Sequence, residues 1–178
     1  MPPVARLWKG VPMDADRRLI EGDDSVGFAT TERNFVRDVV GVGDFEWVRA
    51  TEPSPRNPLP LPLSDARVTL VSTAGAHPRG TRPLGAGGDA LAIPADAPFE
   101  LTHVGYDTER ASADPDVVYP VRRLRALAAA GFIGSLAPTV ISTMGFVPDG
   151  RRLLTRAVPV VLERMLAEEA HLALLVPA

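Results

Sequence analysis

The sequence predicts an α/β domain in which a mostly parallel sheet is flanked by helices, in a Rossmann-like or flavodoxin-like arrangement. The first observation is Ala66–Gly75 (ARVTLVSTAG), an apolar run rich in β-branched residues that is typical of a strand buried on both faces. The second is that strand-like and helix-like segments alternate over the second half of the chain, which favours parallel strands. Ligands of such sheets bind beyond the carboxyl ends of the strands, so the small residues Ser72–Gly75 mark the first place to look for a site. An ordinary turn after a core strand explains them as well.

Length and composition bound the class of protein. The chain has 178 residues, enough for one domain of ordinary size, and its net charge of −3 gives no reason to expect nucleic acid or a membrane surface as a partner. It contains no cysteine, so these residues supply neither a disulfide nor a thiolate nucleophile. The amino terminus lacks an apolar segment of signal-peptide length, and no run approaches the roughly 18 apolar residues of a membrane span. We therefore expect a cytoplasmic protein.

The amino-terminal third differs from the rest of the chain. We expect residues 1–62 to form an irregular segment that ends in a proline-rich linker, and residues 63–178 to form the α/β domain. Pro53–Pro62 contains five prolines, which fix φ and remove backbone donors, as in an extended spacer. Short helical pieces are predicted at Arg17–Glu21 and Asn34–Val40. Aromatic residues are expected to pin this segment onto the core: Phe28, Phe35, Phe45 and Trp47.

The middle of the chain predicts a loop, a second strand and a helix. Ala76–Asp89 is rich in glycine and proline and is predicted to be a loop, after which Ala90–Pro94 is short and apolar. Phe99–Val104 (FELTHV) is predicted to be a strand with a loop at its end. Asp114–Ala130 shows helical spacing of leucines, and Gly131 suits the position just after a helix.

The last third predicts two strands and a helix between them. Thr139–Val147 is strand-like, and small residues near its end, Ser142–Gly145, are candidates for the wall of a site. Arg151–Ala170 is amphipathic and predicts a long helix that Pro159 bends. His171–Val176 (HLALLV) is predicted to be a last buried strand, with His171 itself at the surface.

Five segments in this order resemble the selenoprotein B component of the glycine/sarcosine/betaine/D-proline reductase family. They fall across residues 66–178, and the fourth is the most specific. The segments are LVSTAGAH (Leu70–His77), GD…IP (Gly88–Pro94), THVGYDT (Thr102–Thr108), DPDVVYPVRRLRALAAAGFIGSLAP (Asp114–Pro138) and LALLVPA (Leu172–Ala178).

The resemblance implies a subunit of a selenol- or thiol-dependent reductase. Such enzymes cleave a carbon–nitrogen bond of glycine, betaine, sarcosine, proline or a related amine. The implied partners are the small amine or amino-acid substrate, other reductase subunits and a thioredoxin-like electron donor.

The family's reactive residue lies in a Sec/Cys-x-x-Cys motif directly after the strand that LALLVPA resembles. We therefore expect the catalytic residue directly after Ala178, with none in this chain, and the carboxyl-terminal part of the family fold to be missing. The hypothesis is that the full-length product contains selenocysteine at that position and that this chain is its truncated front part, since selenocysteine is encoded by UGA, which is otherwise read as stop.

Two loops supply the candidate substrate-binding residues: Ser72, Thr73, Gly75, His103, Tyr106 and Asp107. A hydroxyl and a backbone N–H suit a carboxylate, and a histidine beside an aspartate suits proton transfer. Structural roles explain the same residues: His103 hydrogen-bonded beneath its loop, Tyr106 packed, and Asp107 capping the next turn. His77 lies in the predicted loop. The spacing of His77, His103 and Asp107 matches no metal signature, so no metal site is predicted.

Two alternatives remain open from the sequence. One is a non-catalytic, cysteine-free paralogue that binds a small molecule or a partner subunit. The other is a thiol-independent acid–base enzyme that uses His103 and Asp107.

Overall fold

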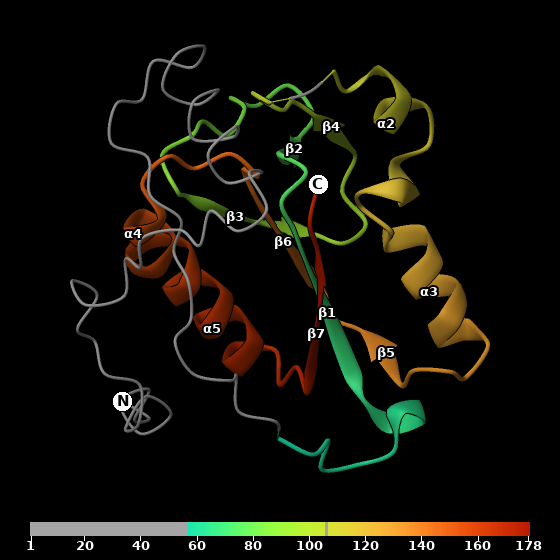
Figure 1. Cartoon of the computed structure of the whole chain (residues 1–178). Helices are drawn as coiled ribbons and strands as arrows, with labels where there is room; N and C mark the ends of the chain where they lie inside the picture. The colour runs from blue at the N-terminus through green and yellow to red at the C-terminus, as the bar shows by residue number, and fades with distance from the viewer. Residues whose placement is uncertain (1–56, 106) are drawn as a thin grey trace, which may run out of the picture. The chain divides into compact units, whose positions relative to one another are not determined.

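The computed structural model describes residues 57–105 and 107–178 (Figure 1). Residues Asn57–Ala178 form a compact unit. The expected helical pieces at Arg17–Glu21 and Asn34–Val40, the four aromatic residues and the first part of the proline-rich linker lie outside the described residues. The boundary between residues 62 and 63 stays a prediction.

A mixed, mostly parallel sheet is built around β1 (Arg67–Ser72). β7 (Leu172–Val176), β5 (Ser135–Leu136) and β6 (Thr139–Thr143) all run parallel to β1, whereas β3 (Ala90–Pro94) is antiparallel to β6. The predicted α/β class and the central place of the ARVTLVSTAG strand are therefore confirmed.

The register fixes the order of the strands. Val68 pairs with both Leu136 and Leu172, so β5 and β7 take opposite sides of β1. Ser72 pairs in the same way with Ser142 of β6 and with Val176 of β7. The order across the sheet is consequently β3, β6 with β5, β1 and β7.

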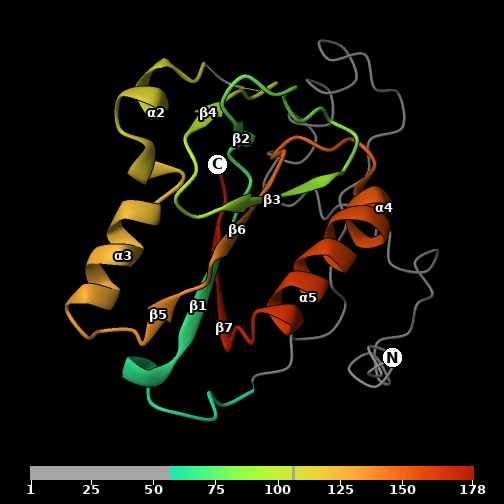
Figure 2. The ribbon, with the colours of Figure 1, turned by 180° about the vertical axis from the view of Figure 1, so that it is seen from behind.

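Helices cover the sheet from both sides. α3 (Val121–Ala129) lies on one side and α5 (Val158–Ala167) on the other, as the two opposite views show (Figures 1 and 2). The carboxyl ends of β1 and β7 point to the end of the unit where the chain terminus lies (Figure 1). None of the described helices is long and apolar enough to cross a membrane.

A second, two-stranded sheet corrects the predicted loop. β2 (Ala76–Pro78) pairs antiparallel with β4 (Phe99–Leu101). Gly75 turns the chain into β2 with a φ of +66°, and its carbonyl accepts from Thr102 N–H (3.3 Å). The prediction of a loop from residue 76 onward is thus wrong for three residues, because pairing across 21 or more positions overrides local glycine and proline content.

The predicted helix over Asp114–Ala130 is two shorter elements, a 3₁₀ turn η5 (Pro115–Val117) and α3. A separate short helix, α2 (Glu109–Ala113), lies directly before them. Pro120 stands directly before α3, and a proline disfavours helical geometry in the residue that precedes it. Gly131 lies just beyond α3 with a φ of +73°, which confirms its predicted role after the helix.

The predicted helix over Arg151–Ala170 is shorter and irregular. It consists of α4 (Gly150–Arg152), a π-helical segment η6 (Leu153–Ala157) and α5. Pro159 has no amide hydrogen for the regular helical ladder, and the π segment lies directly before it, in place of a simple bend. A further 3₁₀ turn, η4 (Leu63–Asp65), precedes β1.

The core lies between the sheet and its covering segments. Its residues are almost fully buried, and they include Val68, Leu70, Ile93, Tyr119, Val121, Leu124, Ile133 and Val140. β7 departs from the prediction of a buried strand: Leu172, Leu174 and Leu175 are 40%, 39% and 68% exposed. The reason is its edge position, since no other strand among the described residues pairs with β7 beyond β1.

Candidate functional site

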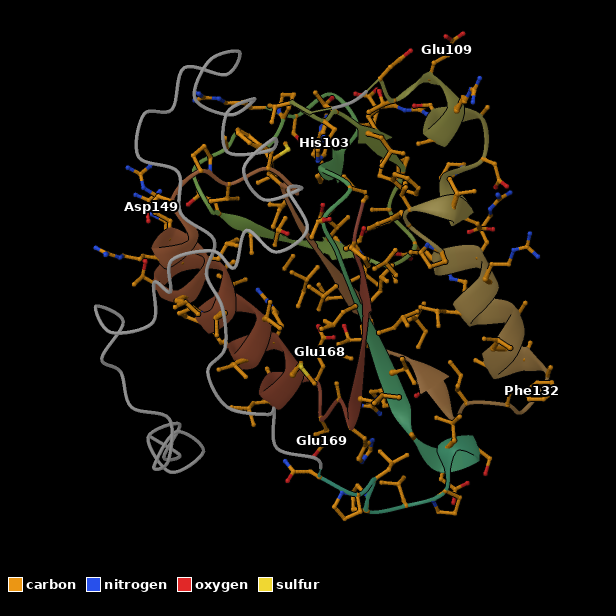
Figure 3. All side chains as sticks on the ribbon, viewed as in Figure 1. His103, Glu109, Phe132, Asp149, Glu168 and Glu169 are labelled. Carbon is orange, nitrogen blue, oxygen red and sulfur yellow. The ribbon has the colours of Figure 1, made fainter. Side chains whose placement is uncertain are left out.

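Four segments meet at the carboxyl ends of the parallel strands. Thr73 follows β1, Gly145 follows β6, Ala178 follows β7, and His103 comes from the loop after β4. A β-carbon added at Gly145 would lie 2.5 Å from the Ala178 carbonyl oxygen, 2.8 Å from His103 Nε2 and 3.2 Å from Thr73 Oγ1. The sidechain view shows His103 at this end of the unit, opposite Glu169 and Phe132 (Figure 3). The structure therefore brings together two of the predicted residues, Thr73 and His103.

Thr73 ties the end of β1 to the end of the chain. Its hydroxyl accepts from Ala178 N–H (2.7 Å) and donates to the Ala178 carbonyl (3.2 Å), while Thr73 N–H donates to the Val176 carbonyl (3.1 Å). These bonds place residue 178 over Gly145. Sequence reasoning missed Ala178 as part of the site; the available signal was that LALLVPA is a strand of the same sheet.

The Ser72 side chain bonds the backbone around the site. It is fully buried, donates to the Val118 carbonyl (2.6 Å) and accepts from Ala74 N–H (3.1 Å). The hydroxyl therefore holds the turn after β1 against the segment that precedes α3.

Gly75 is also a scaffold residue in this structure. Its N–H donates to the Thr143 carbonyl (3.0 Å), so that group is already used. A β-carbon there would overlap the Thr102 carbonyl oxygen. Gly75 thus allows the β1 turn and the His103 loop to approach each other.

His103 has a defined orientation. Its Nδ1 accepts from Gly105 N–H (3.0 Å), two residues further along the chain. Burial lowers the pKa of the imidazole, because the charged form loses more solvation than the neutral form. The neutral ring with Nδ1 as the acceptor carries its hydrogen on Nε2, the atom that faces Gly145.

The last predicted substrate-binding residue in the described part of the chain lies away from Gly145. Asp107 is exposed, and its Oδ1 accepts from Glu109 N–H (3.0 Å) at the start of α2. This is the capping role that the sequence also allowed. Tyr106 lies outside the described residues.

Comparison with known proteins supports the resemblance. A profile described as "Glycine/sarcosine/betaine reductase selenoprotein B" matches residues 89–150. D-proline reductase subunit gamma of Acetoanaerobium sticklandii is 32% identical over 145 residues, which cover 79% of this chain and 60% of that subunit. Both matches support assignment of the chain to the reductase selenoprotein B family.

The two matches have a defined extent. The matched region of the family profile contains His103, Asp107 and Gly145, whereas Thr73 and Ala178 lie outside it. The chain spans 60% of the length of the curated relative it matches. No solved structure matches the chain significantly.

The remaining histidines of the chain lie in other places. His77 is buried in β2, where Nε2 lies 3.1 Å from Thr102 Oγ1 and Nδ1 lies 3.2 Å from the Pro78 carbonyl oxygen. This corrects its predicted place in a loop. His171 is exposed as predicted, with Nδ1 accepting from Arg67 N–H (3.0 Å). Among residues 57–105 and 107–178 no three histidine, aspartate or glutamate side chains gather as metal ligands.

An open hollow of about 430 Å³ lies away from the four converging segments. Ala95, Arg125 and residues 134–138 line it, near the amino end of β6. Arg125 donates to the Ala95 carbonyl there (2.6 Å), so its guanidinium is already engaged with the scaffold.

Proposed function

We propose that this chain is part of a subunit of a selenol- or thiol-dependent reductase that acts on glycine, betaine, sarcosine, D-proline or a related amine. The observation that carries the proposal is the convergence of Thr73, His103 and Ala178 at Gly145, in a chain that is similar to the selenoprotein B family. The strand-end position is where α/β sheets hold their ligands. Within this proposal Thr73 and His103 bind the substrate, while Ser72 and Gly75 shape the site.

The proposed reaction is a reductive cleavage. Two electrons and two protons from a dithiol break the carbon–nitrogen bond, one new C–H and one new N–H bond form, and the dithiol becomes a disulfide. The chain has no cysteine, so the proposal places the attacking group, selenocysteine or cysteine, directly after Ala178 in the full-length product. Support comes from the bonds between Thr73 and Ala178, which hold that position beside His103.

The proposed partner subunits rest on the name of the curated relative. D-proline reductase subunit gamma is by its name one subunit of an enzyme, which supports other reductase subunits as partners. A thioredoxin-like electron donor and a cytoplasmic location complete the proposal, and both rest on the family resemblance.

The geometry of His103 weighs against the acid–base alternative. A histidine–aspartate pair through Nδ1 needs that atom to donate, whereas Nδ1 of His103 accepts from Gly105 N–H. Asp107 holds the start of α2. A second function is therefore not proposed.

Ligand binding tests the site. We expect glycine, betaine, sarcosine or D-proline to bind the 178-residue chain in isothermal titration. We expect Thr73→Val to weaken that binding about tenfold, because a hydrogen bond to a charged group of the ligand is lost or shifted. Thr81→Val is the matched control, since the Thr81 hydroxyl is exposed and bonds only the Pro78 carbonyl (2.7 Å) among the described residues. Equal weakening by both variants, or no binding of any of the four ligands, contradicts the proposed site.

The redox part has a separate test. The intact mass of the protein purified from its natural source is expected to exceed the 19.0 kDa of these residues. Thiol-dependent release of amine by that full-length protein with its partner subunits is the expected activity. A native mass of 19.0 kDa would leave the binding paralogue as the better explanation.

A further inference from the structure

We infer that His103 serves this site as a fixed hydrogen-bond donor through Nε2–H, not as a proton acceptor, and that Gly145 lacks a side chain so that this donor can reach the site. The inference deepens the proposed function, and its ligand part rests on it. The tautomer and the role of Gly145 stand on the geometry alone.

The first step concerns Nδ1, the atom of the His103 ring that the backbone holds in place. Gly105 N–H points at Nδ1 from two residues along the chain, and a backbone N–H can only donate. Nδ1 must therefore carry a lone pair, and protonating it would break this bond. The Gly105 backbone lies close to the ring, since a β-carbon there would sit 3.2 Å from His103 Cε1. The loop thus holds both the position and the tautomer of the imidazole.

The second step is the side of the site that Gly145 leaves open. Gly145 brings its backbone against His103 Nε2, Thr73 Oγ1 and the Ala178 carbonyl, at distances where a β-carbon has no room. Of these groups His103 Nε2–H is a hydrogen-bond donor, whereas the Thr73 hydroxyl already donates its one hydrogen to the Ala178 carbonyl. A ligand or reactive group held here therefore meets a donor from the His103 loop. The group that suits this donor is an anionic acceptor, such as a carboxylate oxygen.

The chain supplies an internal reference for the tautomer, because it has only three histidines. In a neutral His77 ring, Nδ1 must donate to the Pro78 carbonyl and Nε2 accepts from the Thr102 hydroxyl, so His77 has the opposite tautomer to His103. His171 Nδ1 accepts from Arg67 N–H, so His171 shares the tautomer of His103.

Long-range ¹H–¹⁵N correlation of the ¹⁵N-histidine-labelled 178-residue chain at about pH 8, above the ordinary histidine pKa of about 6.5, measures this directly. The expected spectrum shows Nε2–H for His103 and His171 and Nδ1–H for His77, with signals assigned by single histidine-to-glutamine variants. An Nδ1–H tautomer or a doubly protonated ring at His103 overturns the inference.

Two isosteres test the donor in binding. The amide nitrogen of glutamine approximates Nε2, and that of asparagine approximates Nδ1. We expect His103→Gln to keep the affinity for D-proline within about threefold and His103→Asn to lose about tenfold or more, as for one charge-assisted hydrogen bond. Pyrrolidine, which lacks the carboxylate, should bind all three proteins equally weakly. A larger loss in His103→Gln than in His103→Asn contradicts the donor role of Nε2.

Gly145→Ala tests the close approach. We expect the His103 ring signals to shift and D-proline affinity to fall about tenfold, because Nε2 and the Ala178 carbonyl must move away. Gly85→Ala is the matched control, since a β-carbon at Gly85 meets nothing within 4 Å. Unchanged His103 signals in Gly145→Ala overturn the role of Gly145. If wild-type protein binds no ligand while the tautomer is as expected, the proposed function fails and the structural inference stands.

Discussion

Gly75→Ala is expected to destabilise the domain by about 3 kcal/mol or more, in the range of substitutions that force a backbone to move. Two costs add at this position. A left-handed φ of +66° costs a residue with a β-carbon about 1–2 kcal/mol. The new β-carbon would also overlap the Thr102 carbonyl oxygen, so the turn after β1 and the His103 loop must separate.

Gly80→Ala separates the two costs. Gly80 has a similar φ of +75°, but a β-carbon there meets nothing within 4 Å. Its expected loss is only the conformational cost, about 1–2 kcal/mol. Urea unfolding of both variants, compared at equal m-value, gives the difference between them. Equal losses of unfolding free energy would show that the close approach of Gly75 to Thr102 adds nothing to the cost of the substitution.

Ser72→Ala is expected to destabilise the domain by about 2–4 kcal/mol. The buried hydroxyl satisfies two backbone groups, the Val118 carbonyl and Ala74 N–H, and its removal leaves both without this partner in the interior. Each buried polar group that loses its partner costs about 1–3 kcal/mol. Thermal and urea unfolding measure the loss, and retention of the α/β circular dichroism spectrum shows that the fold persists.

Ser142→Ala is the matched control for Ser72→Ala. Ser142 lies directly opposite Ser72 on β6 and is equally buried, but its hydroxyl has no hydrogen-bond partner among the described residues. Removing an unsatisfied buried hydroxyl should leave stability unchanged or raise it by about 1 kcal/mol. Similar destabilisation by both variants would contradict the assigned role of the Ser72 bonds.

Much of the fold was predictable because its signals are local. The ARVTLVSTAG strand is marked by consecutive β-branched and apolar residues, and Gly131 ends α3 because a left-handed position after a helix favours glycine. The alternation of strands and helices also predicted a mostly parallel sheet. Two of the errors concern pairing at a distance: β2 was hidden in a glycine- and proline-rich stretch, and β7 was expected to be buried.

The candidate site shows the same division. Sequence patterns placed Thr73 and His103 at the ends of strands, which is where the structure has them. They did not reveal that Ser72 and Gly75 bond the backbone, because hydroxyls and amides have the same sequence signature in a scaffold and in a ligand site. For Asp107 they left both roles open, and the structure shows the capping role.

The sequence by itself determined the fold class, the family resemblance, the position of the central strand and the lack of a thiol in these residues. Only the tertiary structure decided which of the polar strand-end groups face one another. The Ser72 bond to Val118 joins positions 46 residues apart, and the Thr73 bonds to Ala178 join positions 105 residues apart. Such bonds depend on strand order and register, which neighbouring residues do not encode, so convergence at Gly145 becomes visible only when β1, β6 and β7 lie together.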